Sequence, residues 1–202
     1  MATELREPDQ TAGPGRPRDG RIDAAVLTAT AELLVEVGYA ELTVADIARR
    51  ARTTKPAIYR RWRSKAHLVH EAAFPSEGAL VDVPDTASFA GDLREMVSNV
   101  VTMFANPVAR AAVPGLIGEF GADPTLHAAL LERFQAGPLG ALRSRLAAAV
   151  EAGHARADLD PDSVIESIGG STLLALLVRG DADLDGAWID TTTSLLLKGV
   201  AP

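Results

Sequence analysis

The hydrophobic residues of this chain recur every three or four positions from about residue 21 to residue 199, and they do not alternate with a period of two over any useful length. Such spacing places apolar side chains on one face of an α-helix. Residues that commonly cap helices stand between the periodic stretches, namely Thr43, Thr54, Ser64, Asp123 and Asp160. The pattern predicts an all-α protein of about nine helices.

The N-terminal helices predict a known supersecondary motif. The first helix is expected from about residue 21 to residue 37, where Gly38 can end it. Thr43 then caps a short helix, and after a tight turn Thr54 caps a second one. A further helix is expected from Ser64 to about Phe74. Two short helices joined by a tight turn predict a helix-turn-helix over about residues 43–62.

Positive charge is concentrated in the same segment. Eight basic residues and no acidic residue lie between Arg49 and Lys65, although the whole chain has a net charge of −7. Residues 1–65 carry 12 Lys and Arg against 9 Asp and Glu, or +3, and residues 66–202 carry 8 against 18, or −10. An acidic chain with one such basic window is expected to bind a polyanion there, and nucleic acid is the obvious candidate.

The run IARRARTTKPAIYRRWRSK, from Ile47 to Lys65, resembles the DNA-binding domain of the tetracycline-repressor (TetR) family. The stretch before it, with Gly38-Tyr39 and Leu42-Thr43-Val44, resembles the same domain, so that the likeness covers roughly residues 20–74, about a quarter of the chain. It implies an N-terminal three-helix helix-turn-helix domain and a C-terminal helical bundle that binds a ligand and dimerises. Arg52 stands where the family usually has Gly, and Pro56 replaces a small residue.

The chain is therefore expected to have three parts. Residues 1–19 form a disordered basic arm, residues 20–75 a DNA-binding domain (the head), and residues 76–202 a ligand-binding and dimerisation domain (the body). The Pro114-Gly115 pair is expected to kink or split the second helix of the body. Helices of the body are expected over residues 89–105, 108–120, 124–136, 139–153, 161–179 and 184–199.

The open face of the second short helix is expected to read DNA, because Ile58, Tyr59 and Trp62 are expected to anchor its other face. Small and basic side chains there suit base edges, whereas a hydroxyl, phenol or ammonium at a helix end suits a phosphate. The arm either reaches into the minor groove or is only a solubilising tail. The residues assigned to DNA are Arg16 and Arg18 in the arm, Thr43, Tyr59 and Lys65 for phosphates, Thr54, Lys55, Ala57 and Arg60 for base edges, and Thr53 beside them.

The resemblance also implies an effector pocket inside the body, beneath the head. Its expected wall has few polar groups, with His127 and Glu119 as the polar candidates, so a largely apolar effector is expected. The alternative is that these side chains are only packed core. The residues assigned to the pocket are Met96, Val100, Phe104, Leu116, Phe120, His127, Leu130 and Phe134.

The last two helices are more apolar than one small bundle needs. They are either intrachain core or one half of a four-helix dimer interface, which the family resemblance favours. The residues assigned to this interface are Ile168, Leu173, Leu177, Trp188 and Leu195.

Other function classes have little support. The chain has no Cys, no nucleophile motif and no phosphate-binding glycine loop, so no catalytic residue, cofactor or metal is expected. Metal binding by His67, His70 and Glu71 is conceivable, but a solvated helix face near DNA is favoured. No signal peptide or membrane span is indicated, so a cytoplasmic protein is expected.

The sequence predicts a ligand-responsive transcriptional repressor that binds a palindromic operator as a homodimer and is released by a small molecule. The competing hypothesis is a cytoplasmic small-molecule-binding or catalytic helical bundle with an incidental basic head. The basic window without acids, together with the two capped helices, argues against this competitor.

Overall fold

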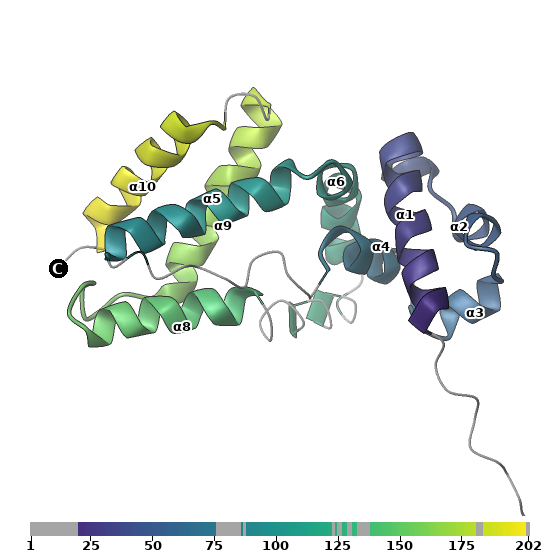
Figure 1. The fold of residues 1–202 in the computed structure, drawn as a ribbon, viewed down its shortest axis with the longest axis horizontal. Helices are drawn as coiled ribbons and strands as arrows, with labels where there is room; N and C mark the ends of the chain where they lie inside the picture. Colours follow the sequence, from purple (N-terminus) through teal and green to yellow (C-terminus); the bar gives the residue numbers. More distant parts are fainter. Residues whose placement is uncertain are drawn as a thin grey trace, which may run out of the picture.

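The computed structural model describes residues 20–75, 86, 88–122, 124, 127–128, 131–132, 138–180 and 184–200. In these residues the chain forms helices and no strand, so the predicted all-α class is confirmed. The helices are α1 (Gly20–Glu41), α2 (Val44–Arg50), α3 (Lys55–Tyr59), α4 (Lys65–Ala73), α5 (Phe89–Ala105), α6 (Pro107–Ala122), α8 (Pro138–Glu151), α9 (Pro161–Arg179) and α10 (Gly186–Val200). Figure 1 shows their arrangement.

The predicted helix starts are confirmed by hydrogen bonds from backbone amides to the capping side chains. Thr43, Thr54 and Ser64 accept from the third residue after each of them, and Asp160 accepts from two amides of α9. Gly38 has a φ of 74° and a ψ of 172°, so α1 breaks where the sequence predicts its end. One short turn follows before α2 begins.

The turn between α2 and α3 is made without glycine. Arg52 adopts a φ of 52°, a left-handed conformation that costs a residue with a Cβ atom about 1–2 kcal/mol. The turn is closed by hydrogen bonds from the Arg52 amide to the Arg49 carbonyl (3.3 Å) and from the Thr53 amide to the Ala48 carbonyl (2.9 Å). The strained backbone leaves the Arg52 side chain exposed beside α3.

The helices pack around two apolar cores. The first joins α1, α2, α3 and α4, and it includes Ala112 and Leu116 of α6. The second joins α5, α8, α9 and α10. Helix α6 follows α5 in the chain but packs against α1 and α4, and it lies between the two groups in Figure 1. The core of the head thus includes a helix from the part of the chain assigned to the body.

The helices of the body follow their predicted ranges closely. Helix α6 continues through Pro114 and is not split there. The helix expected over residues 124–136 falls mostly outside the described residues. Helices α8, α9 and α10 begin within a few residues of the positions that the sequence indicates.

The three residues considered for a metal on α4 do not form one site. The Trp62 indole donates to Glu71 (3.0 Å), and the Arg63 amide donates to Nδ1 of His67 (3.4 Å). His70 is buried, with its ring 5.4 Å from that of Phe74. The expectation of a solvated face is therefore wrong for His70, because α4 turns this side toward the core.

Candidate nucleic-acid interface

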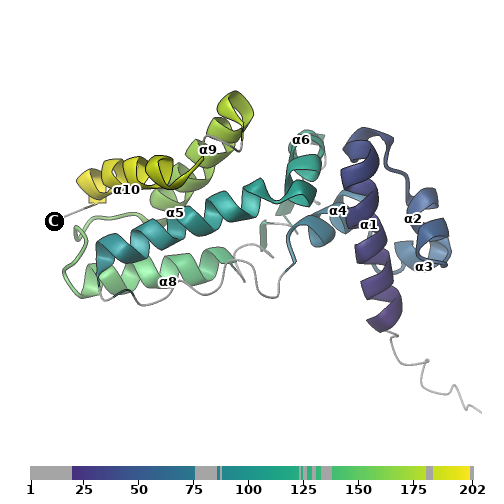
Figure 2. The ribbon, with the colours of Figure 1, turned by 45° about the horizontal axis from the view of Figure 1, so that its top comes forward.

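Helices α2 and α3 lie on the side of α1 that faces away from the body (Figures 1 and 2). Helix α3 is anchored by Ile58, and the loop after it is anchored by Trp62; both side chains are buried. The opposite side of the same segment is open, and the side chains of Thr54, Lys55, Tyr59 and Arg60 are exposed there, with Ala57 and Thr53 half-buried. The predicted recognition face is therefore an accessible surface.

Three of the eight basic residues of this segment form ion pairs within the head. Arg49 donates to Asp46 (2.6 Å), and Arg61 pairs with Asp23 of α1. Arg50 donates both terminal nitrogens to the carboxylate of Glu36, at 2.6 and 2.7 Å. This hydrogen bonding holds the pKa of Glu36 below its usual value. Arg50 thus holds α2 against α1, and Arg61 holds the segment after α3 against α1, whereas Arg49 pairs within α2.

Four other cations surround α3 and form no salt bridge within the described residues. They are Arg52, Lys55, Arg60 and Arg63, all exposed, and we call them the α3 cations. The sequence predicts DNA contacts for Lys55 and Arg60 but not for Arg52 and Arg63. Asp46 lies one helical turn before Arg49, but nothing local marks Arg50 and Arg61 as paired, because their partners Glu36 and Asp23 lie on α1.

Two residues assigned to phosphates already have partners in the chain. The Thr43 hydroxyl donates to the Asp46 carboxylate (2.6 Å) and accepts from the Asp46 amide. The Lys65 ammonium donates to the carbonyls of Tyr39 (2.9 Å) and Leu42 (3.3 Å). Tyr59 is 51% exposed, so the expectation that it helps to anchor α3 is wrong, and its side chain is accessible to a phosphate. Arg16 and Arg18 lie outside the described residues.

The residues assigned to an effector pocket are divided between several environments. Met96 and Val100 are buried in the body core on α5, and Phe104 meets Phe74 of α4 edge to face with ring centroids 6.4 Å apart. Leu116 packs in the head core, and His127 is exposed. The side chain of Phe120 and the residues Leu130 and Phe134 lie outside the described residues.

The helices assigned to a dimer interface have a large apolar surface. Leu177 and Leu195 are 66% and 65% exposed, and Leu174 and Val178, which the sequence analysis did not assign, are 63% and 74% exposed. Leu173 and Trp188 are half-buried. Ile168 is buried in the core of its own chain. The exposed face of α9 is thus shifted from the one that the sequence suggested.

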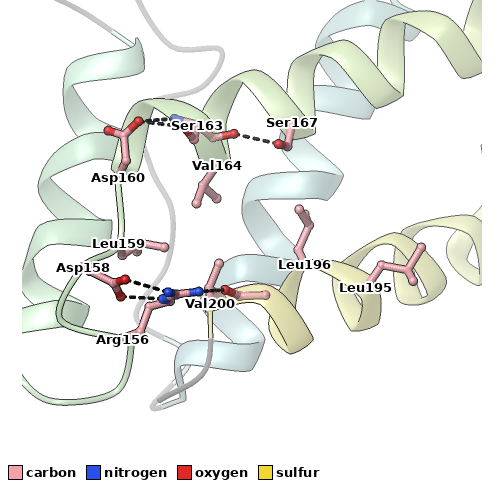
Figure 3. Close-up of a pocket in the computed structure, with 11 residues that line it drawn as sticks. Arg156, Asp158, Leu159, Asp160, Ser163, Val164, Ser167, Leu195, Leu196 and Val200 are labelled. Atoms are coloured by element: carbon pink, nitrogen blue, oxygen red, sulfur yellow. Dashed lines mark hydrogen bonds and ion pairs between the residues drawn. The ribbon is translucent and has the colours of Figure 1, made fainter.

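A groove follows this face between α9 and α10. One part has a volume of about 470 Å³ and runs between Leu174 and Val178 on α9 and Trp188 on α10. The adjoining part, of about 380 Å³, lies by the start of α9 and the end of α10 and shares Leu195 with the first (Figure 3). Its polar wall includes Arg156, whose guanidinium donates to Asp158 and to the Gly199 carbonyl.

Known proteins share both parts of this architecture. The model of the bacterial regulatory proteins of the tetR family matches residues 26–72, and that of the tetracyclin repressor-like C-terminal domain matches residues 83–196. The uncharacterised HTH-type transcriptional regulator YdeS of Bacillus subtilis is 29% identical over 186 residues, which are 92% of this chain and 93% of that protein.

Two further relatives match over most of the chain. The DNA-binding transcriptional repressor TetR of Mycobacteroides abscessus is 29% identical over 172 residues, or 82% of this chain and 86% of that protein. The crystal structure of the TetR family transcription regulator SCO0332 superposes with a TM-score of 0.68 and 30% identity, covering 90% of this chain and all of the other.

The difference between paired and unpaired cations predicts their contributions to DNA affinity. Arg63→Gln should lower the slope of log affinity against log salt concentration by about 0.9, because one phosphate contact is lost. Arg50→Gln should leave this slope unchanged, because Arg50 is held by Glu36. The measurement is a salt titration of binding to random-sequence duplex DNA by fluorescence anisotropy. An equal loss of slope in both variants would contradict the distinction between cations that are held by carboxylates of the head and cations that are available to DNA.

Proposed function

The chain belongs to the TetR family of DNA-binding transcriptional regulators, and we propose that it represses transcription as a homodimer on a two-fold symmetric operator. A small molecule that binds the body releases it from DNA. The observation that carries the proposal is the exposed surface of α3, where four cations without salt bridges in the described residues surround a helix anchored by Ile58 and Trp62. A helix-turn-helix protein places such a surface in the major groove.

The contacts are divided by chemistry. Thr54, Lys55, Ala57 and Arg60 meet base edges, because they lie on the open side of the recognition helix. Tyr59 donates its hydroxyl to a phosphate, and Arg52 and Arg63 add phosphate contacts at either end of α3. Arg16 and Arg18 enter the minor groove beside it. A phosphate contact from Thr43 requires its hydroxyl to leave Asp46.

The dimer forms through α9 and α10. Leu174, Leu177 and Val178 give α9 one apolar face that its own chain leaves exposed. The helix is long and apolar enough to cross a membrane, but its other face packs against α5 and α8. A second copy, which presents the same face, completes a four-helix bundle and removes these side chains from water. The regulator acts in the cytoplasm, where its DNA is.

The effector binds in the body against a mostly apolar wall with one buried hydroxyl. Thr172 of α9 is fully buried, and its hydroxyl makes no hydrogen bond within the described part of the chain. The other two buried threonines behave differently, because Thr30 donates to the Val26 carbonyl (2.7 Å) and Thr193 to the Ile189 carbonyl (2.8 Å). We assign the Thr172 hydroxyl to the effector, as its hydrogen-bonding partner in an otherwise apolar site.

The operator tests this function. Duplexes selected from a random pool by the protein should contain an inverted repeat with half-sites about 10–10.5 bp apart, or a whole number of turns more, because two-fold related recognition helices enter major grooves on one face of DNA. Footprinting should show protection of both half-sites. Selection of a direct repeat, or of no sequence at all, would refute the proposal.

The dimer interface can be tested by placing a charge in it. Leu177→Asp should convert the protein to a monomer in sedimentation at micromolar concentration, since an unpaired charge buried in the interface costs several kcal/mol. Val35→Asp is the matched control, because Val35 is 55% exposed on α1, outside this face. It should remain a dimer. A dimeric Leu177→Asp protein would place the interface elsewhere.

The unsatisfied hydroxyl of Thr172 predicts an unusual effect on stability. Thr172→Val should raise the free energy of unfolding of the effector-free protein by about 1 kcal/mol, because a buried group without a hydrogen bond is removed. Thr193→Val should lower it or leave it unchanged, since that hydroxyl has a partner. Urea unfolding followed by circular dichroism measures both. If Thr172→Val destabilises the protein as much as Thr193→Val does, the hydroxyl is satisfied and its assignment to the effector falls.

A further inference from the structure

The ring of Tyr39 lies directly against the backbone of α6. Gly38, with its φ of 74°, turns the chain at the end of α1 just before this residue. A Cβ atom on Gly115 would lie 2.1 Å from Cγ and Cδ1 of the ring, a distance that real contacts never reach. The absence of a side chain at Gly115 is therefore what allows the ring its place.

The phenol of Tyr39 lies near a second residue of α6, Glu119, but its buried hydroxyl makes no hydrogen bond within the described residues. Burial of the phenol, and then the nearby Glu119 carboxylate, raise the pKa of Tyr39. Gly115 and Glu119 are four residues apart and lie on the same face of α6. Tyr39 is thus held along one stripe of this helix.

Lys65 extends this contact to the start of α4. Its ammonium lies 4.1 Å from the centroid of the Tyr39 ring, a cation–π distance. The same ammonium donates to the carbonyls of Tyr39 and Leu42, near the end of α1. Two of its three N–H donors are thus used by carbonyls, and the ring covers a further side, so one donor at most is left for a phosphate.

The start of α4 is linked closely to the recognition helix. Only five residues separate Tyr59, the last residue of α3, from Lys65. Trp62 within this link is buried and donates to Glu71 of α4 at 3.0 Å. A displacement of Lys65 is therefore transmitted to α3 through a short segment that is packed and hydrogen-bonded.

We propose that Tyr39, Lys65 and Gly115 form a joint that positions the recognition helix on α6, and that Lys65 supports DNA binding through this joint rather than through a phosphate. The proposal rests on DNA binding by α3 as proposed above. It replaces the phosphate role that the sequence suggests for Lys65, and it makes Tyr39 and Gly115 positioning residues, although neither belongs to the recognition helix.

The salt dependence of binding separates the two roles of Lys65. Lys65→Met keeps the aliphatic stem and removes the charge. The affinity of Lys65→Met for a duplex selected by the unaltered protein should fall roughly tenfold. The affinity is measured at a temperature at which circular dichroism shows that the variant is fully folded. The slope against log salt should not change, whereas Arg63→Gln should lose about 0.9. A loss of about 0.9 in Lys65→Met would establish the phosphate contact and overturn the proposal.

Two glycines of α6 supply a matched pair for the joint. Gly115→Ala forces the Tyr39 ring to move, whereas Gly118→Ala adds a methyl group with nothing within 4 Å. Gly115→Ala should therefore bind the selected duplex roughly tenfold more weakly while still folded, and Gly118→Ala should bind as the unaltered protein does. A purely structural role would lower the melting temperature of Gly115→Ala and leave the affinity of the folded protein intact.

The controls separate this proposal from the function on which it rests. If the unaltered protein binds no DNA, or Arg63→Gln keeps its full salt slope, the proposed α3 surface is wrong. If both behave as expected and Gly115→Ala binds normally, the joint alone is wrong. If Gly115→Ala does not fold, Tyr39→Leu takes its place, because this variant removes the ring and its contact with Lys65 without adding a clash. Normal DNA affinity of Tyr39→Leu would overturn the proposal.

Discussion

The placement of the DNA-binding surface depends on the apolar core that joins the head to α6. Ala112 and Leu116 are buried among side chains of α1 and α4, although they come from a helix that follows α5 in the chain. Full burial of a leucine side chain contributes about 1.5–3 kcal/mol, so separation of α6 from the head would cost a large part of a small domain's stability. The head is thus held in a fixed orientation on one helix, and α6 is in turn continuous with the body.

The charges are arranged around this core so that only part of them can meet DNA. Arg50 and Arg61 are used to hold short helices to α1, through Glu36 and Asp23. Helices as short as α2 and α3 are not stable by themselves, and tertiary contacts must fix them. The basic window therefore has two functions, and its total charge overstates the number of phosphates that it can contact.

Much of the fold and of the exposed α3 surface could be predicted from the sequence, because helix starts and turns depend on local chemistry. Thr43, Thr54 and Asp160 cap helices through amides two or three residues away, so their pattern is visible in a few letters. The helix-turn-helix and its exposed Lys55 and Arg60 follow from the same spacing. The likeness to a known family then indicates what the helical body does.

The features that could not be predicted from the sequence depend on contacts between residues that are far apart in the chain. The paired state of Arg50 requires Glu36 from another helix, and the engagement of Lys65 requires two carbonyls more than twenty residues before it. The exposed stripe of α9 differs from the predicted one because Ile168 faces its own core, which only the packing of α5 and α8 decides. Position along a helix indicates a face, but not which neighbour covers it.

The distribution of charge also decides which side of the molecule can approach DNA. Residues 66–202 carry a net charge of −10, and α3 lies on the side of the head that faces away from α5, α8, α9 and α10 (Figures 1 and 2). A polyanion is repelled by the body and attracted by one end of the molecule, which favours encounters in which α3 leads. Because the apolar faces of α9 and α10 belong to the opposite part, a partner subunit can cover them without blocking α3. The proposed DNA-binding and dimer surfaces are therefore separate, and α6, which packs against the head and follows α5, lies between the two groups of helices that carry them.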